Sequence, residues 1–174
     1  MVRLFVALDL PDDIKVQLER YGQGVPGARW VQDRQFHLTL SFLGEVRGPD
    51  VEAVRQGLNG VRCDPFELRL RGLGHFPPRG PPRVLWMGVE ERDELDLLRQ
   101  RIRSRLHRLG MPEDTRRFSP HVTLARLRDT PLPSLLRYME DHLGAETDEF
   151  AVTDFQLFSS VLGRSRARYR IEAS

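Results

Sequence analysis

The chain reads FHLTLSFL at residues 36–43 and HVTLARL at residues 121–127, and each stretch holds a histidine followed two residues later by a threonine. Apolar and β-branched residues alternate with polar ones in both stretches, which is typical of a β-strand. In a strand, residues i and i+2 point to the same face. We therefore expect two strands that each present an imidazole and a hydroxyl on one side.

The two stretches belong to a longer internal repeat. His37 aligns with His121 and Phe66 with Phe150, both at an offset of 84 residues. The strand-like run at the start of the chain aligns with the run that begins at Arg83, at an offset of 80 residues. Two copies of a β-α-β-α-β unit predict two lobes related by a pseudo-twofold axis.

The repeated unit predicts where helices and strands lie. Helices are expected where apolar residues recur at helical spacing and strands where they alternate. The expected strands are 3–10, 36–43, 65–73, 83–89, 121–127, 150–161 and 164–171, and the expected helices are 11–21, 49–58, 93–109 and 132–143.

These elements predict an α+β fold with internal duplication. We expect a single domain over 1–174, built of two lobes at about 1–72 and 83–174, with some exchange of strands between them. Two antiparallel-rich sheets would flank a central cleft, with helices on the outer faces. Residues 72–82 (GLGHFPPRGPP) are expected to link the lobes, because their prolines favour a stiff extended connection.

Composition places the chain among globular proteins. Hydrophobic residues make up 40% of the chain and charged residues 30%, and the longest apolar runs are too short to span a bilayer. Cys63 is the only cysteine, so no internal disulfide can form. We expect a cytoplasmic, monomeric protein with no membrane association.

The charge balance limits the class of partner. The chain carries 27 basic and 25 acidic residues, a net charge of +2, which argues against strong nonspecific binding to duplex nucleic acid. Lys15 is the sole lysine, so the other basic residues are arginines. Codon bias explains such a skew, and so does phosphate recognition, for which the planar guanidinium is well suited.

The paired motifs indicate phosphoryl chemistry. The imidazoles of His37 and His121 suit concerted general acid and base catalysis near neutral pH. The hydroxyls of Thr39 and Thr123 can donate hydrogen bonds to nonbridging phosphate oxygens, and Arg126 adds a positive charge five residues after the second histidine. No carboxylate cluster or zinc motif accompanies them, so we expect a reaction without metal or other cofactor.

The motifs and their surroundings resemble the two-histidine phosphoesterase superfamily, and specifically its RNA 2′,3′-cyclic phosphodiesterase branch, also called 2′-5′ RNA ligase-like. The likeness extends over RLFVALDLP, FHLTLSFLGEV, LGHFPPRGPPRVLWMGV, RFSPHVTLARL and FQLFSS. It implies a bilobal α+β fold with a central cleft and hydrolysis of RNA 2′,3′-cyclic phosphate ends to 2′-phosphates. In some members it also implies reversible 2′-5′ joining of RNA.

The resemblance also assigns roles to residues. By position it makes His37 and His121 the catalytic pair, places Thr39 and Thr123 on the phosphate, and matches Arg126 to the arginine that follows the family's second motif. The expected partners are RNA with a 2′,3′-cyclic phosphate end or a cyclic nucleotide. Which histidine is the acid and which the base stays open.

Four further residues are ambiguous from the sequence. Phe42 occupies the place in the first repeat that Arg126 has in the second, where it would either stack on a base or pack in the core. Strict alternation would turn Arg126 away from the cleft, so a bulge or the strand's end must bring it back, or Arg117 serves the phosphate instead. His75 is expected either at the cleft mouth or on the surface.

Two other functions compete with hydrolysis of RNA ends. One is an RNA-end-binding module without turnover, and the other is a phosphoesterase for a small cyclic or 2′-5′ linked nucleotide. Histidines in both motifs favour an enzyme, because binding alone would tolerate arginine or lysine there.

Overall fold

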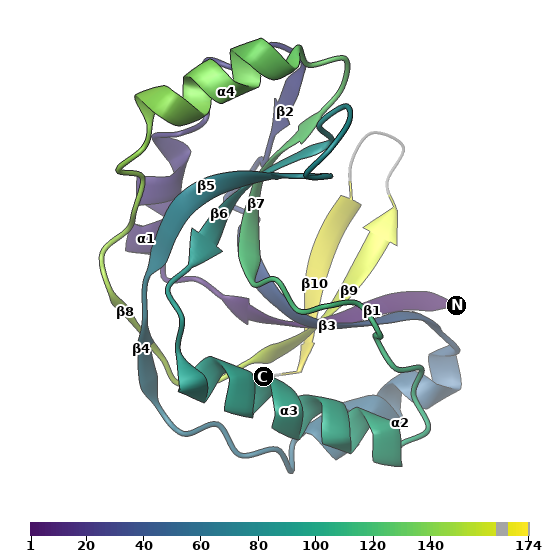
Figure 1. Ribbon diagram of the computed structural model, residues 1–174. Helices are drawn as coiled ribbons and strands as arrows, with labels where there is room; N and C mark the ends of the chain where they lie inside the picture. Colours follow the sequence, from purple (N-terminus) through teal and green to yellow (C-terminus); the bar gives the residue numbers. More distant parts are fainter. Residues whose placement is uncertain (163–166, 174) are drawn as a thin grey trace.

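The computed structural model describes residues 1–162 and 167–173, shown in Figure 1. Strands and helices alternate much as the repeat predicts. Along the chain they are β1 (Val2–Asp9), α1 (Asp12–Glu19), β2 (Ala28–Trp30), β3 (His37–Val46), α2 (Gly48–Leu58), β4 (Phe66–Leu68), β5 (Leu70–Phe76), β6 (Val84–Val89), α3 (Asp93–Arg108), β7 (His121–Leu127), α4 (Leu132–Asp141), β8 (Phe150–Val152), β9 (Gln156–Leu162) and β10 (Ala167–Ala173).

Some element boundaries differ from the sequence-based expectation. The run 65–73 divides into β4 and the start of β5, and the run 150–161 divides into β8 and β9. Strand β2 was not expected. The final strand expected at 164–171 corresponds to β10 from Ala167, while 164–166 lie outside the described residues. Among the described residues, no helix is both long enough and apolar enough to span a membrane.

The inner part of the main sheet is pseudo-symmetric about the junction of β3 and β7. The strand order of this sheet is β10-β9-β1-β3-β7-β6-β5, every pairing is antiparallel, and β2 pairs with β7. Strands β3 and β7 share a single register pair, Leu38 with Val122. The two expected antiparallel sheets are therefore two halves that meet at one point, and β9-β1-β3 in one half corresponds to β5-β6-β7 in the other.

Each repeat contributes its last long strand to the other half of the sheet. Strand β5 pairs with β6 of the second repeat, and β9 pairs with β1 of the first. The expected division into 1–72 and 83–174 allows some exchange of strands, and β5 and β9 are the strands that cross it. Residues 72–82 are not an extended linker: they form most of β5 and the hairpin into β6, closed by a 2.7 Å hydrogen bond from the Arg83 N–H to the Phe76 carbonyl. The prolines lie in the turn, where no ladder hydrogen bond is needed.

The helices are exchanged in the same way. Figure 1 shows α2 beside α3 near β1 and β3, and α1 near α4 at the other side of the molecule. The Tyr138 hydroxyl of α4 donates a 2.6 Å hydrogen bond to the Tyr21 carbonyl after α1. Each helix pair thus combines one helix from each repeat, so the two repeats pack together as one domain.

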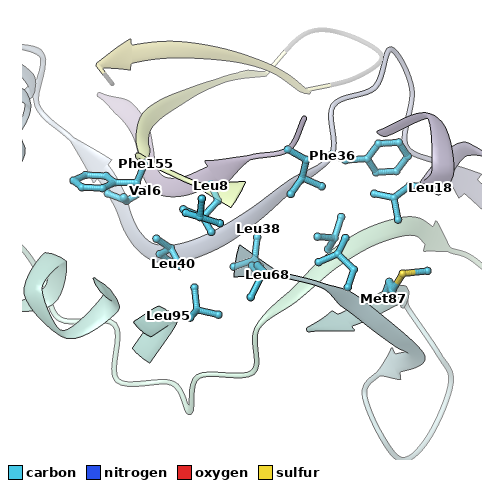
Figure 2. Packing of buried hydrophobic residues seen from close by; sticks show 14 of the residues in the cluster. Val6, Leu8, Leu18, Phe36, Leu38, Leu40, Leu68, Met87, Leu95 and Phe155 are labelled. Carbon is cyan, nitrogen blue, oxygen red and sulfur yellow. The ribbon is translucent and has the colours of Figure 1, made fainter. Parts of the chain in front are cut away.

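The core fixes which face of each motif strand is turned inward. On β1, Leu4, Val6 and Leu8 join the main hydrophobic core, which Leu38 and Leu40 of β3 also enter (Figure 2). The intervening residues of β1 face the other way, and two of them form a small separate cluster with β9: Phe5, Ala7 and Phe158. Because alternate residues face opposite sides, the histidines of β3 and β7 are held on the face away from the main core.

We predict that Leu38→Ala destabilises the protein by about 2–5 kcal/mol, because it leaves a cavity at the junction of the half-sheets, where this side chain is 0% exposed. Urea denaturation measures the loss. Leu143→Ala is the control, since that side chain is 83% exposed and its removal should change stability by less than about 0.5 kcal/mol. Equal stability of the two variants would contradict the described packing.

Candidate active site

The first motif (37–40) and the second motif (121–124) hold their histidines in the same way. His37 Nδ1 lies 3.1 Å from the carbonyl of Gln35, and His121 Nδ1 lies 2.7 Å from the carbonyl of Ser119. A carbonyl only accepts hydrogen bonds, so each Nδ1 carries the proton and donates it. This leaves Nε2 of each ring as the atom that can take up or release a proton.

Each imidazole also lies against two aromatic rings from equivalent strands. The ring of the first motif is 4.9 Å from Phe5 of β1 and 6.0 Å from Phe158 of β9, measured between centroids. The ring of the second motif is 5.0 Å from Phe76 of β5 and 6.0 Å from Trp86 of β6. The pseudo-twofold therefore reproduces the surroundings of the histidines as well as the motifs themselves.

Burial shifts both imidazoles toward the neutral form. Desolvation lowers the pKa of His37 to about 4, the charge of Asp9 opposes this shift, and the charges of His121 and Lys15 add to it. Desolvation also lowers the pKa of His121, with a further contribution from Arg126. The charge of His121 thus acts on His37, so the two imidazoles lie within electrostatic range of each other.

Thr39 and Thr123 lie on the same face as the histidines. Both are half-buried, while Leu38 and Leu40 on one strand and Leu124 on the other are buried in the main core. This is the alternation that the motifs predict. The four polar side chains therefore line the same side of the sheet, two from each half.

A β-bulge follows the threonine of the first motif. Ser41 pairs with Val6 and Thr39 pairs with Ala7, which leaves Leu40 as an extra residue. Its carbonyl accepts a 3.1 Å hydrogen bond from Arg99 Nε of α3. After the bulge the alternation is reversed.

An equivalent bulge follows the threonine of the second motif. Ala125 pairs with Leu85 and Thr123 pairs with Trp86, so Leu124 is the extra residue. The Leu124 carbonyl accepts a 2.9 Å hydrogen bond from the N–H of Val31. Both bulges thus have their free carbonyl satisfied, one by a side chain and the other by the backbone.

The bulges explain how residues five positions after each histidine reach the same face as that histidine. Strict alternation would turn Arg126 away, but the inserted residue restores it to the face of His121, where it is exposed and lowers the pKa of that histidine. The first bulge likewise places Phe42 on the face of His37, with its ring centroid 5.9 Å from that of Phe5. The two repeats thus place a guanidinium at one position and an aromatic ring at its equivalent.

The remaining candidates lie outside the two motifs. His75 is half-buried near the β5–β6 hairpin, where its Nδ1 lies 3.0 Å from the Pro77 carbonyl. Arg117 is exposed in the segment before β7, and His107 is exposed on α3. His142 follows α4, with Nδ1 2.7 Å from the Tyr138 carbonyl, as a capping role requires.

Sequence reasoning missed an ion pair beside the first motif. Lys15 Nζ lies 2.8 Å from Asp9 Oδ1, and Asp9 is the register partner of His37. The one available signal was that Lys15 is the only lysine in the chain. Within the described part of the chain, the charge that acts on His121 is that of Arg126, so the two halves of the site differ electrostatically.

The described residues contain no cluster of three or more histidine, cysteine, aspartate or glutamate side chains that could hold a metal ion. Metal independence stays a prediction that a chelator experiment must test.

The comparison with protein-family models matches residues 10–164 to the 2′-5′ RNA ligase superfamily. This chain belongs to that superfamily. The family membership predicted from the two motifs is therefore confirmed.

Individual relatives in the superfamily are similar over nearly the whole chain. An RNA 2′,3′-cyclic phosphodiesterase of Archaeoglobus fulgidus is 34% identical over 164 residues, which are 92% of each chain. The crystal structure of TT0787 of Thermus thermophilus has a TM-score of 0.77 at 30% identity, covering 98% of this chain and 94% of that one. The crystal structure of Escherichia coli LigT complexed with 3′-AMP has a TM-score of 0.76 at 32% identity, with the same coverage of both chains. These likenesses confirm the α+β fold class.

We predict that the imidazole NMR signals of His37 titrate with a midpoint near pH 4 and those of His121 below pH 6.5. The reference is the urea-unfolded chain, where histidines titrate near pH 6.5. Between about pH 4 and 6.5 the unfolded chain then binds more protons, so the free energy of unfolding decreases as the pH falls through this window. A His37→Gln variant should lose less stability over that range, and titration of both rings at or above pH 6.5 would contradict the described burial.

Proposed function

We propose that this protein hydrolyses 2′,3′-cyclic phosphate ends of RNA to 2′-phosphomonoesters by two-histidine acid–base catalysis. The observation that carries the proposal is the matched pair of imidazoles on β3 and β7, each with Nδ1 tied to a backbone carbonyl. Relatives named RNA 2′,3′-cyclic phosphodiesterase support the activity.

In this reaction one imidazole Nε2 takes a proton from water as the water oxygen bonds to phosphorus. The other Nε2 gives a proton to O3′ as the P–O3′ bond breaks, which leaves a 3′-hydroxyl and a 2′-phosphate. The hydroxyls of Thr39 and Thr123 donate hydrogen bonds to the nonbridging oxygens. The Arg126 guanidinium offsets the negative charge that develops there.

The lowered pKa values fit this cycle. A reaction of this kind needs one neutral and one protonated imidazole. Burial lowers the pKa of both imidazoles and so favours their neutral form. A bound phosphodiester anion has the opposite effect, because it favours protonation of the imidazole that it contacts. The bound substrate would therefore help to protonate the imidazole that acts as the general acid.

The same groups can also join RNA ends. If an RNA 5′-hydroxyl replaces water, its oxygen bonds to phosphorus and O3′ leaves, which yields a 2′-5′ phosphodiester. Because the same proton transfers operate in reverse, we propose that ligation is reversible at this site.

The direct test is incubation with 2′,3′-cyclic AMP in EDTA, with the product identified by ³¹P NMR. We expect a 2′-phosphate. Activity that EDTA abolishes and Mg²⁺ or Zn²⁺ restores would contradict metal independence, and a 3′-phosphate would contradict the regiochemistry. Binding of cyclic phosphate ends without turnover would instead support an RNA-end-binding module.

We predict that His37→Ala and His121→Ala each lower kcat by at least about 100-fold, which is the usual cost of losing a positioned acid or base. His107→Ala is the matched control, because His107 is exposed on α3. Near wild-type turnover in either motif variant, with circular dichroism unchanged, would contradict the mechanism.

We predict that Arg126→Lys lowers kcat/KM almost as much as Arg126→Ala, by about tenfold or more, because lysine keeps the charge but loses the bidentate fork. Steady-state kinetics with a cyclic mononucleotide measure the effect, and exposed Arg128→Ala serves as the control. If both Arg126 variants stay within about twofold of wild type, another group such as Arg117 serves the phosphate.

A further inference from the structure

An ion pair lies at the end of β1, on the face of the sheet that carries His37. Asp9 is the register partner of His37 in the antiparallel pair of β1 and β3. The two side chains therefore point to the same side, with Cβ atoms about 4.5–5.5 Å apart. Lys15 Nζ lies 2.8 Å from Asp9 Oδ1. A carboxylate and its countercharge thus adjoin the imidazole of the first motif.

The backbone between β1 and α1 fixes the position of this carboxylate. Asp9 Oδ1 accepts a 3.0 Å hydrogen bond from the N–H of Leu10, and the Asp9 N–H donates a 3.1 Å hydrogen bond to Gln156 Oε1 of β9. Helix α1 begins at Asp12, so Lys15 near its start can reach back to the end of the strand. The Lys15 side chain is 13% exposed, against 37% for Asp9. The ammonium is therefore largely enclosed in its contact with the carboxylate.

The helix itself does not require a lysine at this place. A cation is unfavourable near the N-terminus of a helix, where the macrodipole is positive, and favourable in the last turn. The first turn of α1 carries Asp12 and Asp13, and its last turn carries no basic residue. Lys15 is also the only lysine in the chain. The contact with Asp9, rather than the stability of the helix, therefore accounts for an ammonium here.

In the second half of the sheet a glycine takes the place of the carboxylate. The register partner of His121 is Gly88 of β6, at the position that Asp9 holds in the first half. The backbone leaves little room for a side chain at Gly88, because a Cβ there would lie 2.9 Å from the Arg71 carbonyl oxygen. The charge that acts on His121 is that of Arg126. The carboxylate with its ammonium is thus a feature of one histidine.

The two charges act on His37 in opposite directions. Burial has the largest effect and lowers the pKa of His37 to about 4. The carboxylate of Asp9 raises this pKa, whereas the charges of His121 and Lys15 lower it. These are the charged and titratable groups that face the ring from β1, β7 and α1 in the described part of the chain, and β9 contributes a phenylalanine ring and a neutral amide. Without Lys15, the carboxylate would favour the imidazolium.

We propose that Lys15 is a positioning residue of the active site, which neutralises Asp9 and thereby keeps the imidazole of His37 neutral until a substrate phosphate binds. This inference rests on the proposed function and identifies how the protonation of one of its two histidines is controlled. Asp9 stays beside the ring as a charge that stabilises the imidazolium once the ring has taken up a proton. Lys15 acts on His37 electrostatically, without contacting the substrate.

The test follows the NMR titration midpoint of His37 in the free protein, which lies near pH 4 in the wild type. Lys15→Met keeps an unbranched side chain but removes its charge, so the midpoint should rise by about half a pH unit or more. Asp9→Asn removes the carboxylate and leaves the ammonium, so the midpoint should fall. The double variant Asp9→Asn/Lys15→Met removes both charges and should return the midpoint toward the wild-type value. Lys15→Arg should retain that value.

Kinetics show whether the same charges act during turnover. The acidic limb of kcat/KM against pH, measured with 2′,3′-cyclic AMP, reports the protonation that inactivates the free enzyme. This limb should move to higher pH in Lys15→Met and to lower pH in Asp9→Asn. It should stay unchanged in Arg62→Met, which breaks an ion pair with Asp64 away from the motifs. A purely structural role would not move the limb in opposite directions.

The outcomes separate this inference from the proposed function. Circular dichroism verifies that each variant is folded. Midpoints that move in the same direction in Lys15→Met and Asp9→Asn, or that keep the wild-type value in both, would overturn the inference. An acidic limb that does not follow shifted midpoints would also overturn it. Absence of cyclic AMP hydrolysis in the wild type would instead overturn the proposed function, while the NMR midpoints would still test the electrostatic control of His37.

Discussion

The contact of Leu38 with Val122 at the centre of the sheet determines where the chemistry can occur. These residues form the single register pair between β3 and β7, and both are fully buried. Anchoring them in the core turns their neighbours, a histidine and a threonine on each strand, to the opposite face. The imidazoles from two distant parts of the chain are thereby brought to one side of one sheet. Every proposed catalytic role depends on this alternation at the junction.

The paired bulges are the second constraint. Without Leu40 and Leu124 as inserted residues, Phe42 and Arg126 would face away from the histidines. The duplication supplies equivalent backbone positions, and the residue types at those positions make the two halves different. Arg126 adds charge beside one histidine, whereas Asp9 and Lys15 lie beside the other. A symmetric fold thus provides an asymmetric site.

Much of this arrangement could be predicted from local sequence pattern. The strands around His37 and His121, the sharing of a face with Thr39 and Thr123, and the α+β duplication all follow from period-two alternation and the repeat. Some exchange of strands is expected from the repeat, but that β5 and β9 are the exchanged strands could not be predicted, because alternation defines a strand but not its partner. The prolines after Phe76 suggested a linker, yet they occupy a hairpin turn. The bulges likewise require knowledge of the register.

The central claim is that the two motifs form one catalytic unit, and the double variant His37→Ala/His121→Ala tests it most directly. The measurement is kcat for a 2′,3′-cyclic mononucleotide in the two single variants and the double variant, each with folding verified. If the imidazoles act in one concerted step, the double variant should lose little more activity than the more impaired single variant. Losses that multiply in the double variant would show that the histidines act independently and would contradict the account.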